Sequence, residues 1–140
     1  MFPKRGKQST TEIARLRRRL DTWFSRYIRL RDQVSPGIIQ CITCGRPKYV
    51  KEAHAGHYQN RRWLATRYHE KNVHAQCPQC NTYDEGRAWE HGQAIDRKYG
   101  KGTAETIANL ARTRCRLGRD WYEHMIGEYK TKVKELGGWH

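Results

Sequence analysis

The chain has no long apolar run and few acidic residues. No segment approaches the ~20 consecutive apolar residues of a membrane-spanning helix, and the opening residues, MFPKRGKQST, hold no apolar signal segment. The sequence therefore argues against a membrane protein. It predicts a cytoplasmic one.

Apolar residues are also scarce. They make up 36% of the 140 residues; counted with Gly in place of Tyr, the fraction is about 39%, below the ~45–50% of ordinary globular chains. The length suits one domain, or a compact core with helical appendages. A hydrophobic core this small predicts that the fold needs an additional stabilising element.

Acidic residues are outnumbered two to one. The chain has 28 Lys and Arg against 14 Asp and Glu, a net charge of +14. Such an excess predicts a polyanionic partner. The basic residues are spread through the sequence rather than packed in one block beside an apolar segment, which favours nucleic acid over an anionic membrane surface.

Five cysteines are present, and four of them form two C-x-x-C pairs, Cys41 with Cys44 and Cys77 with Cys80. Four thiolates close around a tetrahedral zinc ion and leave no open position, so the pairs predict a structural Zn²⁺. The 32 residues between the pairs exceed the interval of a zinc ribbon, which predicts an insertion between the two knuckles. Cys115 follows Ile107 and Ala111 at four-residue steps and is expected to be a small core residue.

Helical patterns flank this insertion. Residues 1–8 form a basic lead, and the capping box of residues 9–12 predicts the start of a helix that ends before Ser35. Further helices are expected from Thr103 to about residue 117 and from Arg119 to about Leu136. The apolar stripes of the first and last helices must pack on the core, on each other or on a second subunit; their members are Ile13, Leu16, Leu20, Trp23, Tyr27 and Leu30, and Tyr122, Met125, Ile126, Tyr129, Val133 and Leu136.

Between the helices the pattern changes to short strands. Residues 38–40 read as a strand that leads into Cys41, and residues 48–57 as the arms of a hairpin. A broken helical stretch follows Cys77 up to Tyr99, with its interruption near Gly86. The sequence thus predicts an α+β fold with three parts: an N-terminal lead and helix (1–34), a zinc-containing core (35–100) and a C-terminal helical flank (101–140).

The insertion and its end carry a set of residues suited to metal and acid–base chemistry: His54, His57, Asn72, His74 and Asn81. In order, the sequence reads C-x-x-C-G, A-G-H-Y and N-x-H-x-Q-C-x-x-C-N. This arrangement resembles the zinc-containing HNH and His-Me finger (ββα-metal) nucleases. It is closest to the phage recombination endonuclease family NinG (Rap), and it is also similar to phage endonuclease VII, whose second knuckle likewise ends in C-x-x-C-N.

The resemblance implies a role for each matching residue. His57 would be the general base, because an imidazole with a pKa of ~6.5 is mostly neutral yet still basic at cellular pH. Asn81 would bind a catalytic Mg²⁺ or Mn²⁺ through its carbonyl oxygen. Asn72 would orient the loop that carries His57. His74 would assist at the site, although a packing or hydrogen-bonding role is equally open.

One position departs from the wider class. Many relatives place Asp or His directly before the base as a metal ligand, and here that residue is Gly56. The NinG pattern has an acidic residue three positions before the base, where this chain has His54. A strictly alternating strand would put positions 54 and 57 on opposite faces. We therefore expect His54 to reach the metal only if the strand is bulged or turned; otherwise it is a partly exposed strand histidine.

The function implied is a metal-dependent DNA endonuclease that leaves a 5′-phosphate and a 3′-hydroxyl, selective for branched recombination intermediates such as Holliday junctions. Arg61, Arg62 and Arg67 would clamp phosphates. Cutting a junction symmetrically needs two sites, so a homodimer is expected. The alternative is a non-catalytic four-cysteine zinc module that binds nucleic acid.

Overall fold

The computed structural model describes the backbone of residues 2–140 and the side chains of residues 11–140. It divides into two compact units: residues 1–27 with 116–140, and residues 28–115. Each unit is described separately below. No helix in the described part of the chain is both long enough and apolar enough to cross a membrane.

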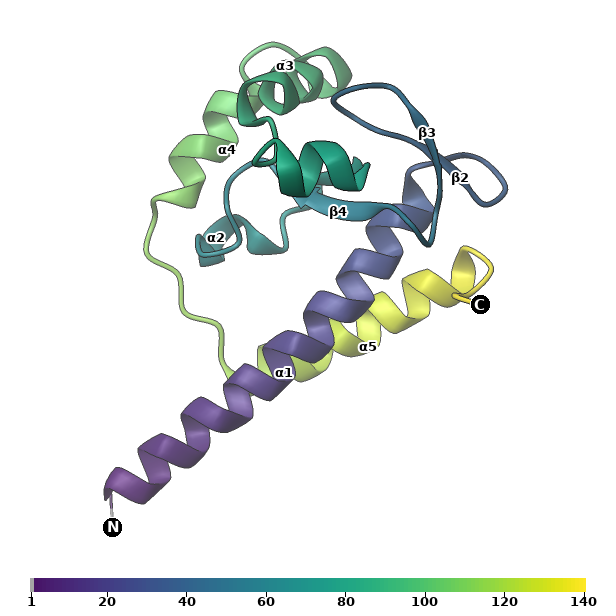
Figure 1. The fold of residues 1–140 in the computed structure, drawn as a ribbon. Coiled ribbons are helices and arrows are strands. Elements are labelled where there is room, and N and C mark those ends of the chain that lie inside the picture. Colours follow the sequence, from purple (N-terminus) through teal and green to yellow (C-terminus); the bar gives the residue numbers. More distant parts are fainter. Residues whose placement is uncertain (1) are drawn as a thin grey trace. The chain divides into compact units, whose positions relative to one another are not determined.

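The first unit is a pair of helices, most of α1 (Phe2–Arg31) and all of α5 (Arg119–Glu135), lying side by side (Figure 1). The Phe24 ring meets the Tyr129 ring edge to face, with centroids 5.1 Å apart, and the Arg17 Nε donates to the Tyr122 hydroxyl at 2.9 Å. The contacts advance along both helices in the same direction, so the pair is parallel. The apolar stripes of the two helices therefore cover each other, one of the options that the sequence left open.

The first helix begins earlier than the sequence predicted. It starts at Phe2, so residues 2–8 are helical rather than a lead outside the helix. Pro3 is tolerated in a first turn, where its missing N–H would have no partner anyway, and the Lys, Arg and Gln that follow are good helix formers. The predicted capping box begins at Ser9 and Thr10, whose side chains lie outside the described residues.

The second unit is built on two small antiparallel sheets. One has the order β1-β2-β3, formed by β1 (Gln33–Ser35), β2 (Ile38–Gln40) and β3 (Pro47–Tyr49). The other pairs β4 (His54–His57) with β5 (Val73–Gln76). The strand predicted at 38–40 is confirmed, but the predicted hairpin over 48–57 is wrong. Its two arms pair with β2 and with β5 instead, because those strands share the buried cluster of Ile39, Ala53 and Ala75.

Short helices complete this unit. They are α2 (Leu64–Arg67), a 3₁₀ turn η1 (Glu70–Asn72), a π-helical turn η2 (Gln79–Tyr83), α3 (Ala88–Tyr99) and α4 (Thr103–Ala111). The predicted interruption near Gly86 is confirmed by positive φ angles at Glu85, Gly86 and Arg87. Helices α3 and α4 pack through Ile95, Ala104 and Ile107.

The structure corrects two details of the flank. Helix α4 ends at Ala111 rather than near residue 117, because Thr113 Oγ1 and Arg112 Nη1 donate to the carbonyls of Leu110 and Ala108 in its last turn. Cys115 consequently lies beyond the helix and is half-buried rather than a core residue. An extended segment connects α4 to α5 (Figure 1).

Candidate metal and nuclease site

The four paired cysteines converge on one point. Cys41 follows β2 and Cys44 lies in the turn before β3, where Gly45 adopts a φ of +76°. Cys77 directly follows β5, and Cys80 lies in η2. The Ile42 N–H donates to the Ala75 carbonyl at 3.0 Å, which fixes the first knuckle to β5 and so beside the second.

Their geometry fits a zinc ion. The four sulfur atoms all lie within 4.8 Å of one another, and the Cys44 and Cys77 Sγ atoms are 3.7 Å apart. A tetrahedral ion with Zn–S bonds of ~2.3 Å places its ligands about 3.8 Å apart. The cluster is therefore sized for a closed four-thiolate site.

Burial and the neighbouring thiols shift the pKa values of these cysteines. Burial raises the pKa of Cys44, and the neighbouring thiols of Cys41, Cys77 and Cys80 raise it further. Burial likewise raises the pKa of Cys77. For Cys41, hydrogen bonds from Thr43 and from backbone N–H groups outweigh burial and lower the pKa. Four thiolates packed so closely need a positive ion between them.

Asn81 follows the second knuckle and meets the first residue of β4. Its side-chain Nδ2 lies 3.0 Å from the His54 Nδ1. An amide N–H donates, so the neutral His54 accepts at Nδ1. Burial and then the charge of Arg29 lower the pKa of His54, which keeps its ring neutral and able to act as a ligand. The two residues predicted to share a catalytic metal are thus in contact.

The ladder between β4 and β5 is regular, with His54 opposite Gln76, Ala55 opposite Ala75, Gly56 opposite His74 and His57 opposite Val73. No bulge separates positions 54 and 57, so the side chains of His54 and His57 start from opposite faces of β4. The bulge that we expected His54 to need is therefore absent: His54 meets Asn81 because η2 brings Asn81 to the face of β4 that His54 occupies, whereas His57 starts from the other face.

His57, the last residue of β4, is held by the last residue of α2. Its Nε2 lies 2.9 Å from the backbone carbonyl oxygen of Arg67. A carbonyl oxygen only accepts, so Nε2 carries the hydrogen and the basic lone pair of the neutral ring is on Nδ1. This backbone carbonyl group therefore sets the tautomer of His57 and helps to orient its ring.

Asn72 organises the loop that contains this carbonyl group. It is fully buried; its Oδ1 accepts from the Gln59 N–H at 2.7 Å, and its Nδ2 donates to the carbonyls of Gln59 and Thr66 at 3.1 and 3.0 Å. These bonds connect the residues just after His57 to the residue just before Arg67. The geometry agrees with the orienting role that the resemblance implies for Asn72.

His74 is buried, unlike a side chain that touches substrate. Its side chain is 1% exposed, and its ring nitrogens lie 3.1 Å from the His91 Nε2 and 2.8 Å from the Tyr99 hydroxyl. Burial, followed by the charges of His91, Arg31 and Lys98, lowers its pKa to about 2. The structure favours the packing and hydrogen-bonding role over direct assistance in catalysis.

The three arginines predicted to bind phosphate lie around α2, beside His57. Arg67 Nη1 donates to the Arg61 carbonyl at 3.0 Å, and the Arg62 guanidinium stacks 4.8 Å from the centre of the Trp63 ring. Arg112 approaches the same ring at 5.1 Å. We call Arg61, Arg62 and Arg67 the arginine loop. Arg61 and Arg62 lie just before α2, and Arg67 ends that helix and holds the predicted base through its backbone carbonyl group.

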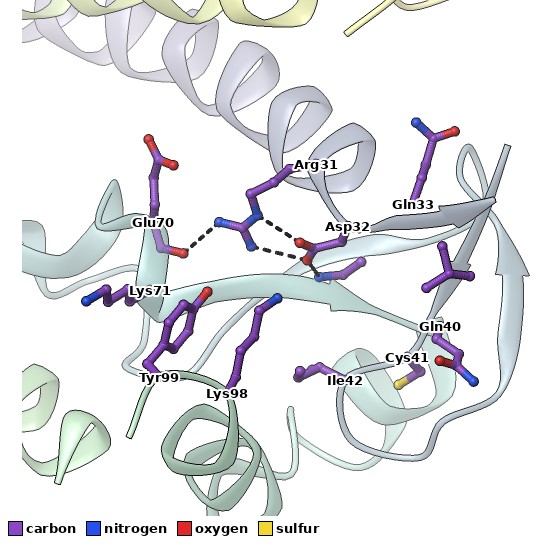
Figure 2. A pocket seen from close by; sticks show the side chains of 12 residues that line it. Arg31, Asp32, Gln33, Gln40, Cys41, Ile42, Glu70, Lys71, Lys98 and Tyr99 are labelled. Carbon is purple, nitrogen blue, oxygen red and sulfur yellow. Dashed lines mark hydrogen bonds and ion pairs between the residues drawn. The ribbon is translucent and has the colours of Figure 1, made fainter. Parts of the chain in front are cut away.

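A separate cleft of about 760 Å³ opens alongside β5 (Figure 2). Arg31 and Asp32 form an ion pair of 2.8 Å in it, and Figure 2 shows Lys71, Lys98 and Tyr99 grouped at the same side of the cleft. None of His54, His57 and Asn81 lines it. Sequence reasoning did not identify this cleft, because the residues that form it come from five separated segments with no shared motif.

Comparison with known proteins identifies the family to which the chain belongs. No curated protein and no solved structure matches the chain. The family model described as bacteriophage lambda NinG protein matches residues 4–138, nearly the whole length, and covers both knuckles and the residues between them. The chain therefore belongs to the NinG family of phage proteins.

Proposed function

We propose that this protein is a metal-dependent DNA endonuclease with a structural zinc. The observation that carries the proposal is the contact of 3.0 Å between His54 and Asn81 beside the four-cysteine cluster. Thiolates suit zinc, whereas an imidazole with an amide oxygen suits a harder divalent cation, so the two sets select different ions.

The residues present fit a catalytic cation. Rotating the Asn81 amide by half a turn would direct its oxygen, in place of its nitrogen, toward the side of His54 that carries the Nδ1 lone pair. Both groups are neutral ligands, and the imidazole favours Mn²⁺ relative to an all-oxygen set. A cation held there would stabilise negative charge on the scissile phosphate and on the leaving oxygen.

His57 is the proposed general base. With Nε2–H donated to the Arg67 carbonyl, its Nδ1 takes a proton from the attacking water, and the carbonyl stabilises the imidazolium that results. Asn72 acts as a positioning residue, because its bonds to Gln59 and Thr66 fix the loop that holds this carbonyl in place. The products would be a 5′-phosphate and a 3′-hydroxyl.

DNA is the proposed substrate because arginines lie on and just before α2, the helix whose last carbonyl group holds the predicted base. The arginine loop lies next to His57, and Lys71 and Lys98 add positive charge along the cleft on β5. The net charge of +14 supplies a long-range attraction to the same polyanion. Incubating the full chain with labelled linear, flapped and four-way DNA in Mg²⁺, Mn²⁺ or chelator tests both the activity and the preference for branched substrates.

A homodimer acting on four-way junctions is the more specific proposal. The apolar stripes of α1 and α5 do not favour a second subunit, since they cover each other. What supports it is family membership and the two-fold symmetry of a junction. Light scattering at micromolar concentration, with paired-nick analysis on a cruciform plasmid, tests it. A monomer that nicks linear duplex at random would contradict the dimer while leaving the nuclease chemistry intact.

A further inference from the structure

Gln76 ends β5 and is completely buried. It lies directly opposite His54 in the ladder. Opposite residues of an antiparallel pair project from the same face, with Cβ atoms about 4.5–5.5 Å apart. The Gln76 side chain therefore starts beside His54, on the face where His54 meets Asn81.

The orientation of the Gln76 carboxamide is determined by its partners. Its Nε2 donates to the Thr43 Oγ1 at 3.1 Å and to the Gly86 carbonyl at 3.0 Å. The Gly86 oxygen can only accept, so turning the amide over would bring two oxygens together. The nitrogen therefore faces Thr43 in the first knuckle and Gly86 in the loop after η2, and Oε1 points away from both, toward Gly56.

That oxygen has no hydrogen-bond partner although it is buried. A Cβ added to Gly56 would lie only 1.9 Å from it, so Oε1 fills the space that a side chain at position 56 would occupy. Gly56 has no positive φ that would demand glycine. Glycine is needed there because the Gln76 oxygen takes the room. A buried amide oxygen without a partner is costly and calls for an explanation.

We propose that the Gln76 Oε1 is a third ligand of the divalent cation assigned to His54 and Asn81, an inference that rests on the proposed function. The amide oxygen is a hard, neutral donor of the same kind as that of Asn81. Because its nitrogen is bonded to Thr43, inside the first knuckle, Gln76 also connects the zinc cluster to the catalytic cation. Metal affinity at the second site would then depend on the fold around the first.

The test measures Mn²⁺ binding to the full zinc-loaded chain by electron paramagnetic resonance, with zinc content as the check on folding. Gln76→Ala should weaken Mn²⁺ binding by about tenfold or more while about one zinc per chain remains. Gln93→Ala is the matched control: it makes the same chemical change at an exposed residue of α3, outside both metal sites, so its Mn²⁺ affinity should stay within about twofold of the parent, well short of a ligand's effect.

Gly56→Ala provides a second route, because its methyl group must displace Oε1, and it should also weaken Mn²⁺ binding with zinc retained. In Gly56→Asp/Gln76→Ala an oxygen returns to the same space from the opposite strand, and Mn²⁺ affinity should recover relative to Gln76→Ala. The inference is overturned if Gln76→Ala or Gly56→Ala, with zinc retained, binds Mn²⁺ as the parent does, or if the double variant shows no recovery. Cleavage by the parent together with parental Mn²⁺ binding in both single variants would overturn this inference alone; a parent that neither binds Mn²⁺ nor cuts DNA would overturn the proposed function as well.

Discussion

The side-chain amide of Asn81 lies 3.0 Å from the Nδ1 of His54, although 27 positions separate the two residues in the chain. The pairing of β4 with β5 and the turn of η2 after the second knuckle bring them together. The four-cysteine cluster includes Cys80, which lies within η2 directly before Asn81. The proposed zinc site and the proposed catalytic metal site are therefore connected through η2.

Removing one thiolate should unfold the protein. In Cys77→Ser the fourth zinc ligand is lost, and binding of a structural zinc contributes about 10–16 kcal/mol that is coupled to folding. Elemental analysis should find about one zinc in the parent and far less in the variant, and circular dichroism should show loss of structure. The unpaired, half-buried Cys115 offers the control: Cys115→Ser should keep zinc and fold. A folded, zinc-free Cys77→Ser protein would contradict the prediction that the fold depends on bound zinc.

Asn72→Ala should destabilise the fold by about 2–4 kcal/mol, because it leaves several buried polar groups of Gln59 and Thr66 without partners. Urea unfolding with zinc present measures the change. Asn60→Ala makes the same chemical change at an exposed residue whose side chain accepts one bond, from the Arg62 N–H. Its cost should be within about 1 kcal/mol. Equal losses in the two variants would argue against the orienting role of Asn72.

Acid should destabilise the second unit through its buried histidines. Burial, and then the charge of His57, lowers the pKa of His91 to about 4, and burial first of all lowers that of His74 to about 2. Above pH 6.5 both histidines are neutral in the folded and in the unfolded protein, so they do not make the stability depend on pH. As pH falls below 6.5 the unfolded chain binds protons that the folded chain refuses, so stability declines by up to about 1.4 kcal/mol per pH unit for each histidine, until pH reaches the folded pKa.

Urea titrations between pH 5 and 6.5 with saturating zinc measure this slope. His91→Gln removes one of the two histidines, so its stability should depend less steeply on pH, by about 1.4 kcal/mol per unit. Loss of zinc from protonated thiols would affect the parent and the variant alike. Identical slopes in the two proteins would show that His91 does not resist protonation.

Replacing the arginine loop should weaken DNA binding and reduce its dependence on salt. In Arg61→Ala/Arg62→Ala/Arg67→Ala, each lost phosphate contact lowers the slope of log affinity against log salt by about 0.9. The matched control is Arg15→Ala/Arg18→Ala/Arg19→Ala, which removes the same charge from exposed positions of α1. Fluorescence anisotropy at several salt concentrations compares them. An equal effect of both triple variants would show that net charge, rather than the arginine loop, determines binding.

Some of this architecture could be predicted because its signals are local. The two C-x-x-C pairs, the short strand before Cys41 and the break near Gly86 each depend on residues a few positions apart. The convergence of the four cysteines could be predicted in the same way, since spacing within a knuckle determines whether two thiolates can share an ion.

Strand pairing could not be predicted so easily. The residues of β3 and β4 are close in sequence, which suggested a hairpin, but β4 pairs with β5, sixteen or more positions away. The choice depends on which apolar side chains bury together, here Ile39, Ala53 and Ala75, and no short window contains all three. The pairing of His54 with Gln76 across β4 and β5 could not be predicted for the same reason.

Packing also selected among neighbouring aromatic residues of α1. The sequence placed Trp23 on the apolar stripe, whereas Phe24 is buried against Tyr129 and Trp23 remains half-exposed. The guanidinium of Arg26 lies 4.8 Å from the centre of the Trp23 ring, which stabilises the ring at the surface. One position on a helix turns a side chain by 100°, so the face that packs is set by the partner helix.

The most direct test of the proposed nuclease compares the parent and His57→Ala on a labelled four-way junction, with DNA affinity measured on the same preparations. We expect the parent to cut in Mg²⁺ or Mn²⁺ and not in chelator. His57→Ala should cut about 10²–10⁴-fold more slowly while it binds the junction as tightly as the parent, because the base acts on the water and not on the phosphates. His57→Ala cleaving at the parental rate, or a zinc-loaded parent that cuts no DNA in either metal, would contradict it.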